Sequence, residues 1–155
     1  MRDLKAAILQ EAGPPVFAKP HGRRKRFTGH VFASVEDLLY LERASASTEI
    51  LCSEVVRWQS EFRVFVVQGT VVGIRHYGGD PAHRIDEEQV RRAVQLLEES
   101  GEGTAGYAVD FGVLESGQTA IVEWNDGFSL GAYGLGQGPY TDLTLARWLE
   151  LVRPV

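Results

Sequence analysis

The chain has 155 residues, a net charge of −5 and 44% hydrophobic residues. These values suit one soluble globular domain, or two small lobes that share a cleft. No run approaches the roughly 20 apolar residues of a membrane span, the N-terminus is not a signal peptide, and the negative charge argues against non-specific binding to nucleic acid. The single cysteine, Cys52, lies in an apolar run and predicts a buried thiol in a reducing cytoplasm.

The first half of the chain predicts short elements. Apolar residues recur with helical spacing over residues 3–11, and Gly13-Pro14-Pro15 ends that helix. A second helix is predicted over 35–43, with Ser34 and Asp37 as its capping box. The predicted strands are 16–19, 26–33 and 50–53.

The second half predicts two β-hairpins and two helices. The strands of the hairpins are 62–67 and 71–77, and then 107–114 and 119–123. A helix begins at Asp86, with Gln89 at the capping-box position, and ends at Gly101. Residues 127–138 hold five glycines and form a loop before a last helix over 141–152. The order of elements indicates an α+β fold with mostly antiparallel strands.

The second hairpin carries the most specific polar pattern of the chain. Glu123 and Asn125 are two residues apart on one strand and therefore share a face. Asp110 precedes Glu123 by thirteen residues, and the turn can bring it alongside them. Mg²⁺ prefers such hard oxygen ligands, so the three side chains predict a magnesium site. A solvated strand end with ordinary polar residues remains the alternative.

A basic run over residues 18–29 places Lys19 at a strand end and Lys25 in or after a turn. Lysine binds phosphate as a point charge, and glycines let backbone N–H groups approach it. The run does not match the phosphate loop of P-loop NTPases. It is open to three interpretations: a phosphate site, a solvated basic turn or a nucleic-acid patch.

Arg63 interrupts the apolar run 62–67, and Arg75 lies on the partner strand. A charge on a dry face needs a partner, so we expect an anion near Arg63. A two-residue turn within Gln68-Gly69-Thr70 would place the two arginines on opposite faces, whereas a three-residue turn with a bulge would pair them. Edge-strand arginines that face water are the alternative.

Together, these motifs resemble the ATP-grasp superfamily, and most closely its clade named for one arginine and two lysines. The resemblance covers roughly residues 15–150. It is carried by Lys19-Pro20, a second lysine before Phe27-Thr28-Gly29, Glu61 to Val67, Asp110 and the Glu123-x-Asn125 pair. The implied fold has two small α+β lobes around a nucleotide cleft, with lobes at about 15–53 and 61–153 joined by a hinge at 54–60.

The resemblance also implies a role for each motif. The implied ATP ligands are Lys19 and Lys25 for the phosphates, Glu54, Val55 and Val56 for the adenine edge, and Glu61 for the ribose. The implied magnesium ligands are Asp110, Glu123 and Asn125. Arg63 and Arg75 are the implied catalytic residues, and residues 127–138 correspond to a loop that closes over the acceptor.

The implied activity is that of an ATP-dependent ligase with ATP and Mg²⁺ as cofactors. It activates a small-molecule or peptide carboxylate as an acylphosphate for attack by an amine or similar nucleophile. Two departures stand out. Ala108 occupies a position where many carboxylate–amine ligases have arginine. The family's usual N-terminal domain is also not apparent, so we expect either a fragment or a reduced enzyme whose acceptor pocket comes from a partner protein.

These departures keep two alternatives open. One is a non-catalytic module that binds nucleotide or protein. The other is a kinase-like phosphotransferase, since Asp110-Phe111-Gly112 spells a kinase metal motif although the other kinase motifs are missing.

Overall fold

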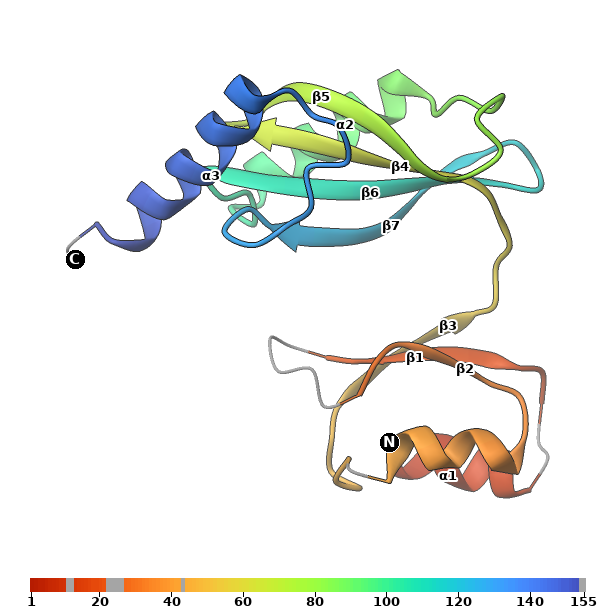
Figure 1. Cartoon of the computed structure of the whole chain (residues 1–155). Helices are drawn as coiled ribbons and strands as arrows, with labels where there is room; N and C mark the ends of the chain where they lie inside the picture. Colours follow the sequence, from red (N-terminus) through yellow and green to blue (C-terminus); the bar gives the residue numbers. More distant parts are fainter. Residues whose placement is uncertain (11–12, 22–26, 43, 154–155) are drawn as a thin grey trace. The chain divides into compact units, whose positions relative to one another are not determined.

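The computed structural model describes residues 1–10, 13–21, 27–42 and 44–153. The chain divides into two compact units, Met1–Val56 (unit 1) and Arg57–Val155 (unit 2), each with its own sheet and its own core (Figure 1). All strand pairs are antiparallel, and helices occur in both units. The predicted α+β class is therefore confirmed. Among the described residues, no helix is long and apolar enough to cross a membrane.

Unit 1 is a three-stranded sheet with two short helices. Its elements are α1 (Arg2–Leu9), β1 (Val16–Pro20), β2 (His30–Phe32), the 3₁₀ helix η1 (Val35–Leu41) and β3 (Ile50–Glu54). The strands lie in the order β2-β1-β3. Leu4, Ala18, Phe32 and Leu41 each come from a different element and together form the core.

Three expectations for unit 1 need correction. In the described part of 26–33, only His30–Phe32 is strand, because pairing with β1 ends at Ala18 and His30. The helix after Ser34 is 3₁₀ over Val35–Leu41, which is long for that helix type. Asp37 does accept the Ser34 N–H at 2.9 Å. Cys52 is exposed, because β3 is an edge strand.

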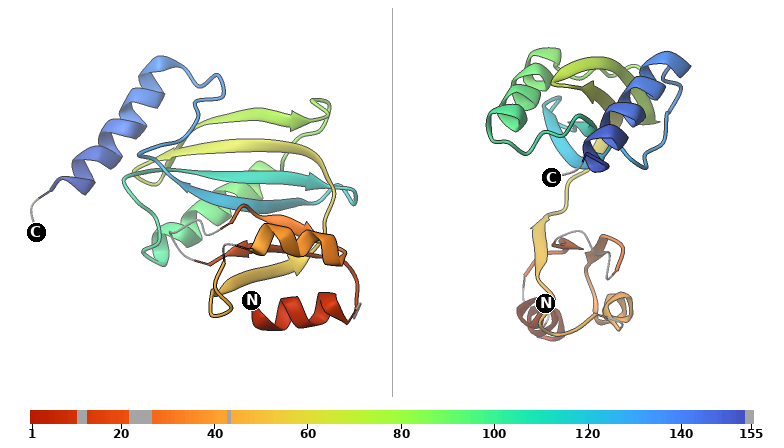
Figure 2. Two further views of the ribbon diagram at one scale, coloured as in Figure 1. Left: turned by 60° about the horizontal axis from the view of Figure 1, so that its bottom comes forward. Right: turned by 90° about the vertical axis from the view of Figure 1, so that its left-hand side faces the viewer.

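Unit 2 is a four-stranded sheet with a helix on either face. Its elements are β4 (Trp58–Val67), β5 (Thr70–Gly79), α2 (Glu87–Glu99), β6 (Gly106–Leu114), β7 (Thr119–Asp126) and α3 (Gln137–Leu151). The strands lie in the order β5-β4-β6-β7. In the right-hand view of Figure 2, α2 and α3 lie on opposite sides of the strands of this sheet. We call the two sides the α2 face and the α3 face.

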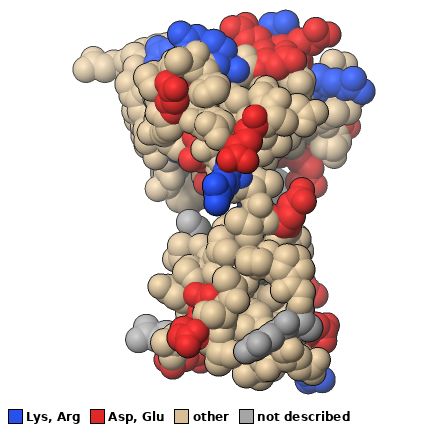
Figure 3. Space-filling model, turned by 90° about the vertical axis from the view of Figure 1, so that its right-hand side faces the viewer, with Lys and Arg blue, Asp and Glu red and all other residues tan. Residues whose placement is uncertain are grey.

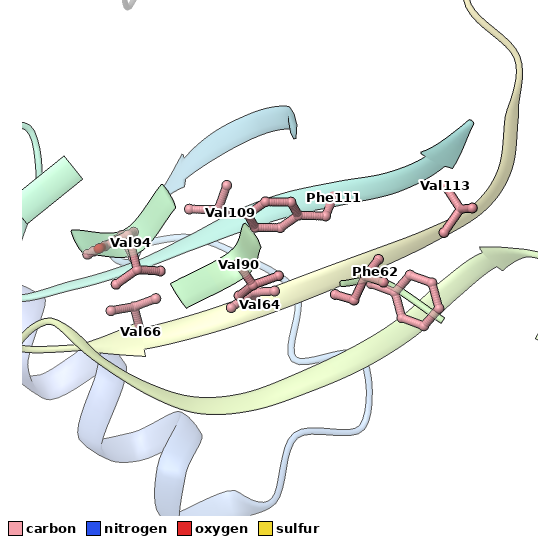
Figure 4. Packing of buried hydrophobic residues seen from close by; sticks show 10 residues of the cluster. Phe62, Val64, Val66, Val90, Val94, Val109, Phe111 and Val113 are labelled. Atoms are coloured by element: carbon pink, nitrogen blue, oxygen red, sulfur yellow. The ribbon is translucent and has the colours of Figure 1, made fainter. Parts of the chain in front are cut away.

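The α2 face holds the main hydrophobic core. Alternate residues of β4 and β6 point toward α2 and meet its apolar stripe, as Figure 4 shows. The labelled side chains are Phe62, Val64, Val66, Val90, Val94, Val109, Phe111 and Val113. Burying each such side chain contributes about 1.5–3 kcal/mol. Asp86 caps α2 by accepting the N–H groups of Glu88 and Gln89 at 2.9 and 3.2 Å, as predicted.

The β4–β5 hairpin decides where its two arginines lie. The turn is Gln68-Gly69, with φ of 46° and 74°, a conformation typical of a two-residue type I′ hairpin. The expectation that such a turn separates the arginines is wrong. Phe65 pairs with Gly73 while Val66 pairs with Val71, so one extra residue bulges from β5 and Arg63 pairs with Arg75.

Several boundaries also differ from prediction. The second hairpin is longer than expected, since β7 continues to Asp126, and α3 begins at Gln137. The predicted hinge at 54–60 spans the end of β3, residues 55–57 and the start of β4. Acidic and basic side chains lie side by side on unit 2, in the upper part of Figure 3.

Candidate functional site

A buried ion pair lies at the centre of the α3 face. Arg63 on β4 and Asp110 on β6 are directly paired across the strands. The guanidinium donates from Nε to Oδ1 at 2.7 Å and from Nη2 to Oδ2 at 2.6 Å. Arg63 is 7% and Asp110 2% exposed. The anion expected near Arg63 is thus, in this structure, a carboxylate of the chain itself.

Two tyrosines enclose the Arg63 guanidinium. Its Cζ atom lies 4.7 Å from the ring centroid of Tyr133 and 5.9 Å from that of Tyr77. Such cation–π contacts strengthen when the cation is desolvated. The Tyr77 hydroxyl donates to Glu61 at 3.1 Å, so Glu61 belongs to the same polar cluster.

The electrostatics of this cluster follow from burial and its carboxylates. Burial, followed by the charges of Asp110 and Glu61, raises the pKa of Tyr77 well above 10 and keeps the phenol neutral. The hydrogen bonds that Arg63 donates to Asp110 raise the pKa of Arg63. Arg63 is therefore a permanent cation whose position is set by Asp110.

The glycine-containing loop brings Tyr133 over the arginine. Tyr133 and Gly134 have φ of 44° and 80°, and Leu135 N–H donates to Ala132 O at 2.8 Å, which closes a tight turn. A positive φ is unfavourable for tyrosine, so the surroundings must hold it. Leu135 is buried in the apolar cluster of the α3 face, and Arg75 donates from Nε to Gly134 O at 3.1 Å.

Arg147 on α3 anchors the end of β7, directly before this loop. Arg147 is buried and donates to both carboxylate oxygens of Asp126 at 2.7 Å and to Glu150 at 2.8 Å. These carboxylates raise the pKa of Arg147, and the Ala105 N–H lowers the pKa of Glu150. The end of β7 is thereby fixed to α3.

The three predicted metal ligands lie together on the α3 face. Asp110 pairs with Glu123, and Ala108 pairs with Asn125. Asn125 Nδ2 donates to Asp110 Oδ2 at 3.2 Å. Among the described residues, Oδ2 therefore accepts from both Arg63 and Asn125, whereas Oδ1 accepts one hydrogen bond, from the Arg63 Nε–H, and has a second lone pair.

This donor set fits Mg²⁺. Two carboxylates and one amide oxygen are hard ligands, and Mg²⁺ commonly uses one or two carboxylates with water and phosphate oxygens. Within the described ranges, no group of three or more His, Cys, Asp and Glu side chains forms a metal cluster. The set is thus suited to an ion that phosphate oxygens help to bind.

The other predicted ATP ligands belong to unit 1 or its border. Lys19 is half-buried on β1, opposite Leu51. Glu54 ends β3, and Val55 and Val56 follow it, all exposed. Lys25 lies outside the described residues. The structure thus brings together the predicted residues of unit 2, namely Glu61, Arg63, Arg75, Asp110, Glu123 and Asn125.

Sequence reasoning missed Tyr77 and Tyr133. Neither belongs to a motif, and the only signal was that Tyr133 lies within the glycine loop. The kinase-like triplet Asp110-Phe111-Gly112 lies inside β6. Packing explains its glycine, because any side chain at Gly112 would overlap the ring of Trp58.

Solved structures with the same fold define the class of this domain. The chain resembles N5-carboxyaminoimidazole synthetase from Staphylococcus aureus, with a TM-score of 0.61, 14% identity, and coverage of 94% of this chain and 43% of that one. It also resembles carboxyaminoimidazole ribonucleotide synthase from Aspergillus clavatus complexed with ATP, with a TM-score of 0.58, 15% identity, and coverage of 100% and 45%.

A third structure with this fold is the macrocyclase MdnC from Microcystis aeruginosa MRC, bound with precursor peptide MdnA. Its TM-score is 0.58 at 15% identity, over 95% of this chain and 50% of that one. The chain thus spans at most half the length of these three proteins. At 14–15% identity, these structures share the fold of this chain.

The chain belongs to the family described as ATP-grasp domain, R2K clade family 2, whose model matches residues 1–143. The predicted membership of the clade named for one arginine and two lysines is confirmed. A search of curated proteins found no match.

Proposed function

We propose that this chain binds Mg-ATP and phosphorylates a substrate carboxylate, which then reacts with an amine or similar nucleophile. The observation that carries the proposal is the arrangement on the α3 face of unit 2. There, Asp110, Glu123 and Asn125 share one side of a hairpin, next to a buried arginine and below a glycine-containing loop. Membership of the ATP-grasp family supports the use of ATP.

Each group has a defined part in this proposal. Asp110, Glu123 and Asn125 hold Mg²⁺, which neutralises triphosphate charge when bound. Lys19 and Lys25 contact the phosphates, the backbone of residues 54–56 contacts the adenine edge, and Glu61 binds the ribose. Arg63 stabilises the negative charge on the transferring phosphoryl group.

The role of Arg63 is supported by the surroundings of Ala108. Ala108 is fully buried with Phe65, Leu135 and Leu143, so an arginine there would enter an apolar cluster. Arg63 instead brings its guanidinium to Asp110 from the neighbouring strand. We infer that Arg63 takes the place of the arginine that many carboxylate–amine ligases have at the position of Ala108, while Arg75 holds the loop through Gly134.

The proposed reaction has two steps. A carboxylate oxygen of the substrate attacks the γ-phosphorus of ATP, and the bond to the β–γ bridging oxygen breaks, so that ADP leaves and an acylphosphate forms. An amine then attacks the acyl carbon, phosphate leaves, and the amine nitrogen loses a proton. Neither step needs a nucleophilic side chain, so positioning and charge stabilisation are sufficient.

The fold neighbours support a proposal for the substrate class. One neighbour is a macrocyclase bound to its precursor peptide, and others are synthetases of small molecules. We therefore place the acceptor among peptide or small-molecule carboxylates. Because those proteins are at least twice as long as the matched region, the acceptor pocket is assigned in part to a further segment or to a partner protein.

Nucleotide binding tests the first half of the proposal. Glu123→Gln removes one proposed magnesium ligand, and Glu115→Gln is its matched control in the turn of the same hairpin. Calorimetric titration with a non-hydrolysable ATP analogue should show Mg²⁺-dependent binding that weakens at least about tenfold in the first variant, or 1.4 kcal/mol, and is unchanged in the second. Equal affinities in the two variants would remove Glu123 from the site.

Turnover tests the second half. Arg63→Lys keeps a positive charge but loses the two-pronged guanidinium geometry. Phosphate release measured across a panel of amino acids and peptides should fall about tenfold or more while analogue affinity changes little. Equal turnover would remove Arg63 from catalysis. Analogue binding without turnover on any acceptor would favour the non-catalytic binding module instead.

A further inference from the structure

The outer side of α3 carries an exposed apolar stripe. Its members recur at i, i+3, i+4 and i+7, which places them on one side of a helix. They are Leu145, Trp148, Leu149 and Val152, exposed by 50, 59, 54 and 51%. The same helix buries Leu143 and Arg147 on its other side. Both sides of α3 are thus built for packing, and only one is used within unit 2.

Such a helix is normally covered on both sides. A contiguous apolar patch of this kind marks an interaction surface more often than a chance exposure. The C-terminal part of α3 extends past the ends of the strands in Figure 1 and in the left view of Figure 2. This part of α3 therefore projects from the sheet of unit 2.

The charges beside the stripe indicate which molecule covers it. Asp142 precedes the stripe and Arg153 follows it. The helix ends at Leu151, and its C-cap Val152 keeps an αR backbone, with φ of −97° and ψ of 0°. At about 100° per residue, Asp142 and Arg153 therefore fall on about the same flank. When two identical helices pack antiparallel, equal flanks face each other, so the acid of each copy meets the base of the other. Parallel packing would not bring them together.

We propose that the stripe is a self-association surface on which α3 packs antiparallel against α3 of a second copy. The two-fold symmetry places Leu145 of each copy against Val152 of the other, and Trp148 against Leu149. Asp142 and Arg153 form an ion pair at each end. One helical face is smaller than the roughly 800 Å² per partner of a stable interface, so the dimer is expected to be weak and concentration-dependent.

Sedimentation velocity of the whole chain over roughly 1–500 µM covers the affinity range of such an interface. The wild type is expected to shift from monomer to dimer across this series. Leu149→Glu should remain monomeric. Leu96→Glu is the matched control, because Leu96 lies on α2 with 55% exposure against 54% for Leu149, and it should dimerise as the wild type does.

Charge reversal tests the antiparallel arrangement. Asp142→Arg and Arg153→Asp should each weaken dimerisation, and the double variant should restore it to the wild-type level. A wild type that stays monomeric throughout overturns the proposal and assigns the stripe to a partner of another kind. Equal loss in Leu149→Glu and Leu96→Glu, dimerisation of Leu149→Glu, or additive weakening in the double charge variant would also overturn it.

Discussion

The two faces of the unit 2 sheet use the same strands for opposite purposes. On the α2 face, the side chains that β4 and β6 contribute to the core are aliphatic or aromatic, and they meet α2 there. On the α3 face, the intervening residues of the same strands contribute the Arg63–Asp110 pair. An apolar cluster of Phe65, Ala108, Leu135 and Leu143 continues that face under the glycine-containing loop.

The difference teaches how a small domain supports a charged centre. Because side chains alternate along a strand, Arg63 and Asp110 are each flanked by two residues that are held in the core. Arg63, for example, lies between Phe62 and Val64, both of which face α2. The core therefore positions the site, and the ion pair has little freedom to move. The predictions below probe each face in turn.

The largest effect is expected from opening the core. Phe111→Ala should lower the free energy of unfolding by about 3–5 kcal/mol, because Phe111 is 2% exposed and leaves a cavity. All three tryptophans lie in unit 2, so tryptophan fluorescence during urea unfolding reports on this unit. Phe128→Ala, at a 62% exposed position, should change stability by less than about 0.5 kcal/mol. Equal losses would mean that Phe111 does not define the core.

A similar or slightly smaller effect is expected on the α3 face. Arg63→Met leaves the Asp110 carboxylate buried without its guanidinium, which should lower the free energy of unfolding by about 3 kcal/mol. The double variant Arg63→Met, Asp110→Leu should recover at least half of that loss, since no charge then remains buried. The measurement is urea unfolding. Additive losses in the double variant would contradict the view that the two residues act as one pair.

The contact between β5 and the loop is expected to contribute less. A Cβ at Gly73 would lie 2.5 Å from Leu135 Cδ1, so Gly73→Ala should displace Leu135 and lower stability by about 1–2 kcal/mol. Faster cleavage of the loop at Tyr133 by chymotrypsin would report its loosening. Gly138→Ala is the control: it lies in α3 with open space around it and should be neutral or slightly stabilising.

The smallest effect compares a buried tyrosine on each face. Tyr77 donates to Glu61 on the α3 face, and Tyr107 donates to Glu98 at 2.8 Å on the α2 face. Burial raises the pKa of both above the ordinary value of 10.0. Removing either hydroxyl by a Tyr→Phe change should lower stability by about 1 kcal/mol at neutral pH.

The direction of the pH effect follows from the raised pKa values. Folding favours the neutral phenols, so their contribution is fully present below pH 10, the unfolded value, and is lost as the pH rises above it. The stability of the wild type should therefore fall above pH 10. The stability of the double variant Tyr77→Phe, Tyr107→Phe should fall less over the same range. Tyrosinate absorbance follows the titration directly. An ordinary titration near pH 10 for both groups would contradict their burial.

Local chemistry made much of the fold predictable. The capping residue Asp86 and the apolar spacing after it placed α2, and alternating apolar residues placed both hairpins. The spacing of Asp110, Glu123 and Asn125 was sufficient to predict that they share a face, because a short turn and a two-residue period determine this locally. The family motifs were likewise contained in short segments.

Other features depended on contacts between distant segments. The partner of Arg63 lies 47 residues away on β6, so only the order of strands in the sheet could select it. The bulge in β5 decided that Arg75 shares a face with Arg63, which the sequence had left open, because no local signal separates a regular hairpin from a bulged one. The exposure of Cys52 followed from the edge position of β3.

The sequence by itself therefore determined the α+β class, the family and the acidic hairpin, since each rests on residues that are neighbours along the chain. Tertiary structure alone decided that Asp110 pairs with Arg63, that Tyr133 covers this pair and that Arg75 holds the loop. The physical reason is that a charge in a low-dielectric face must be paired, and which partner it takes depends on the strands and loops that packing brings beside it.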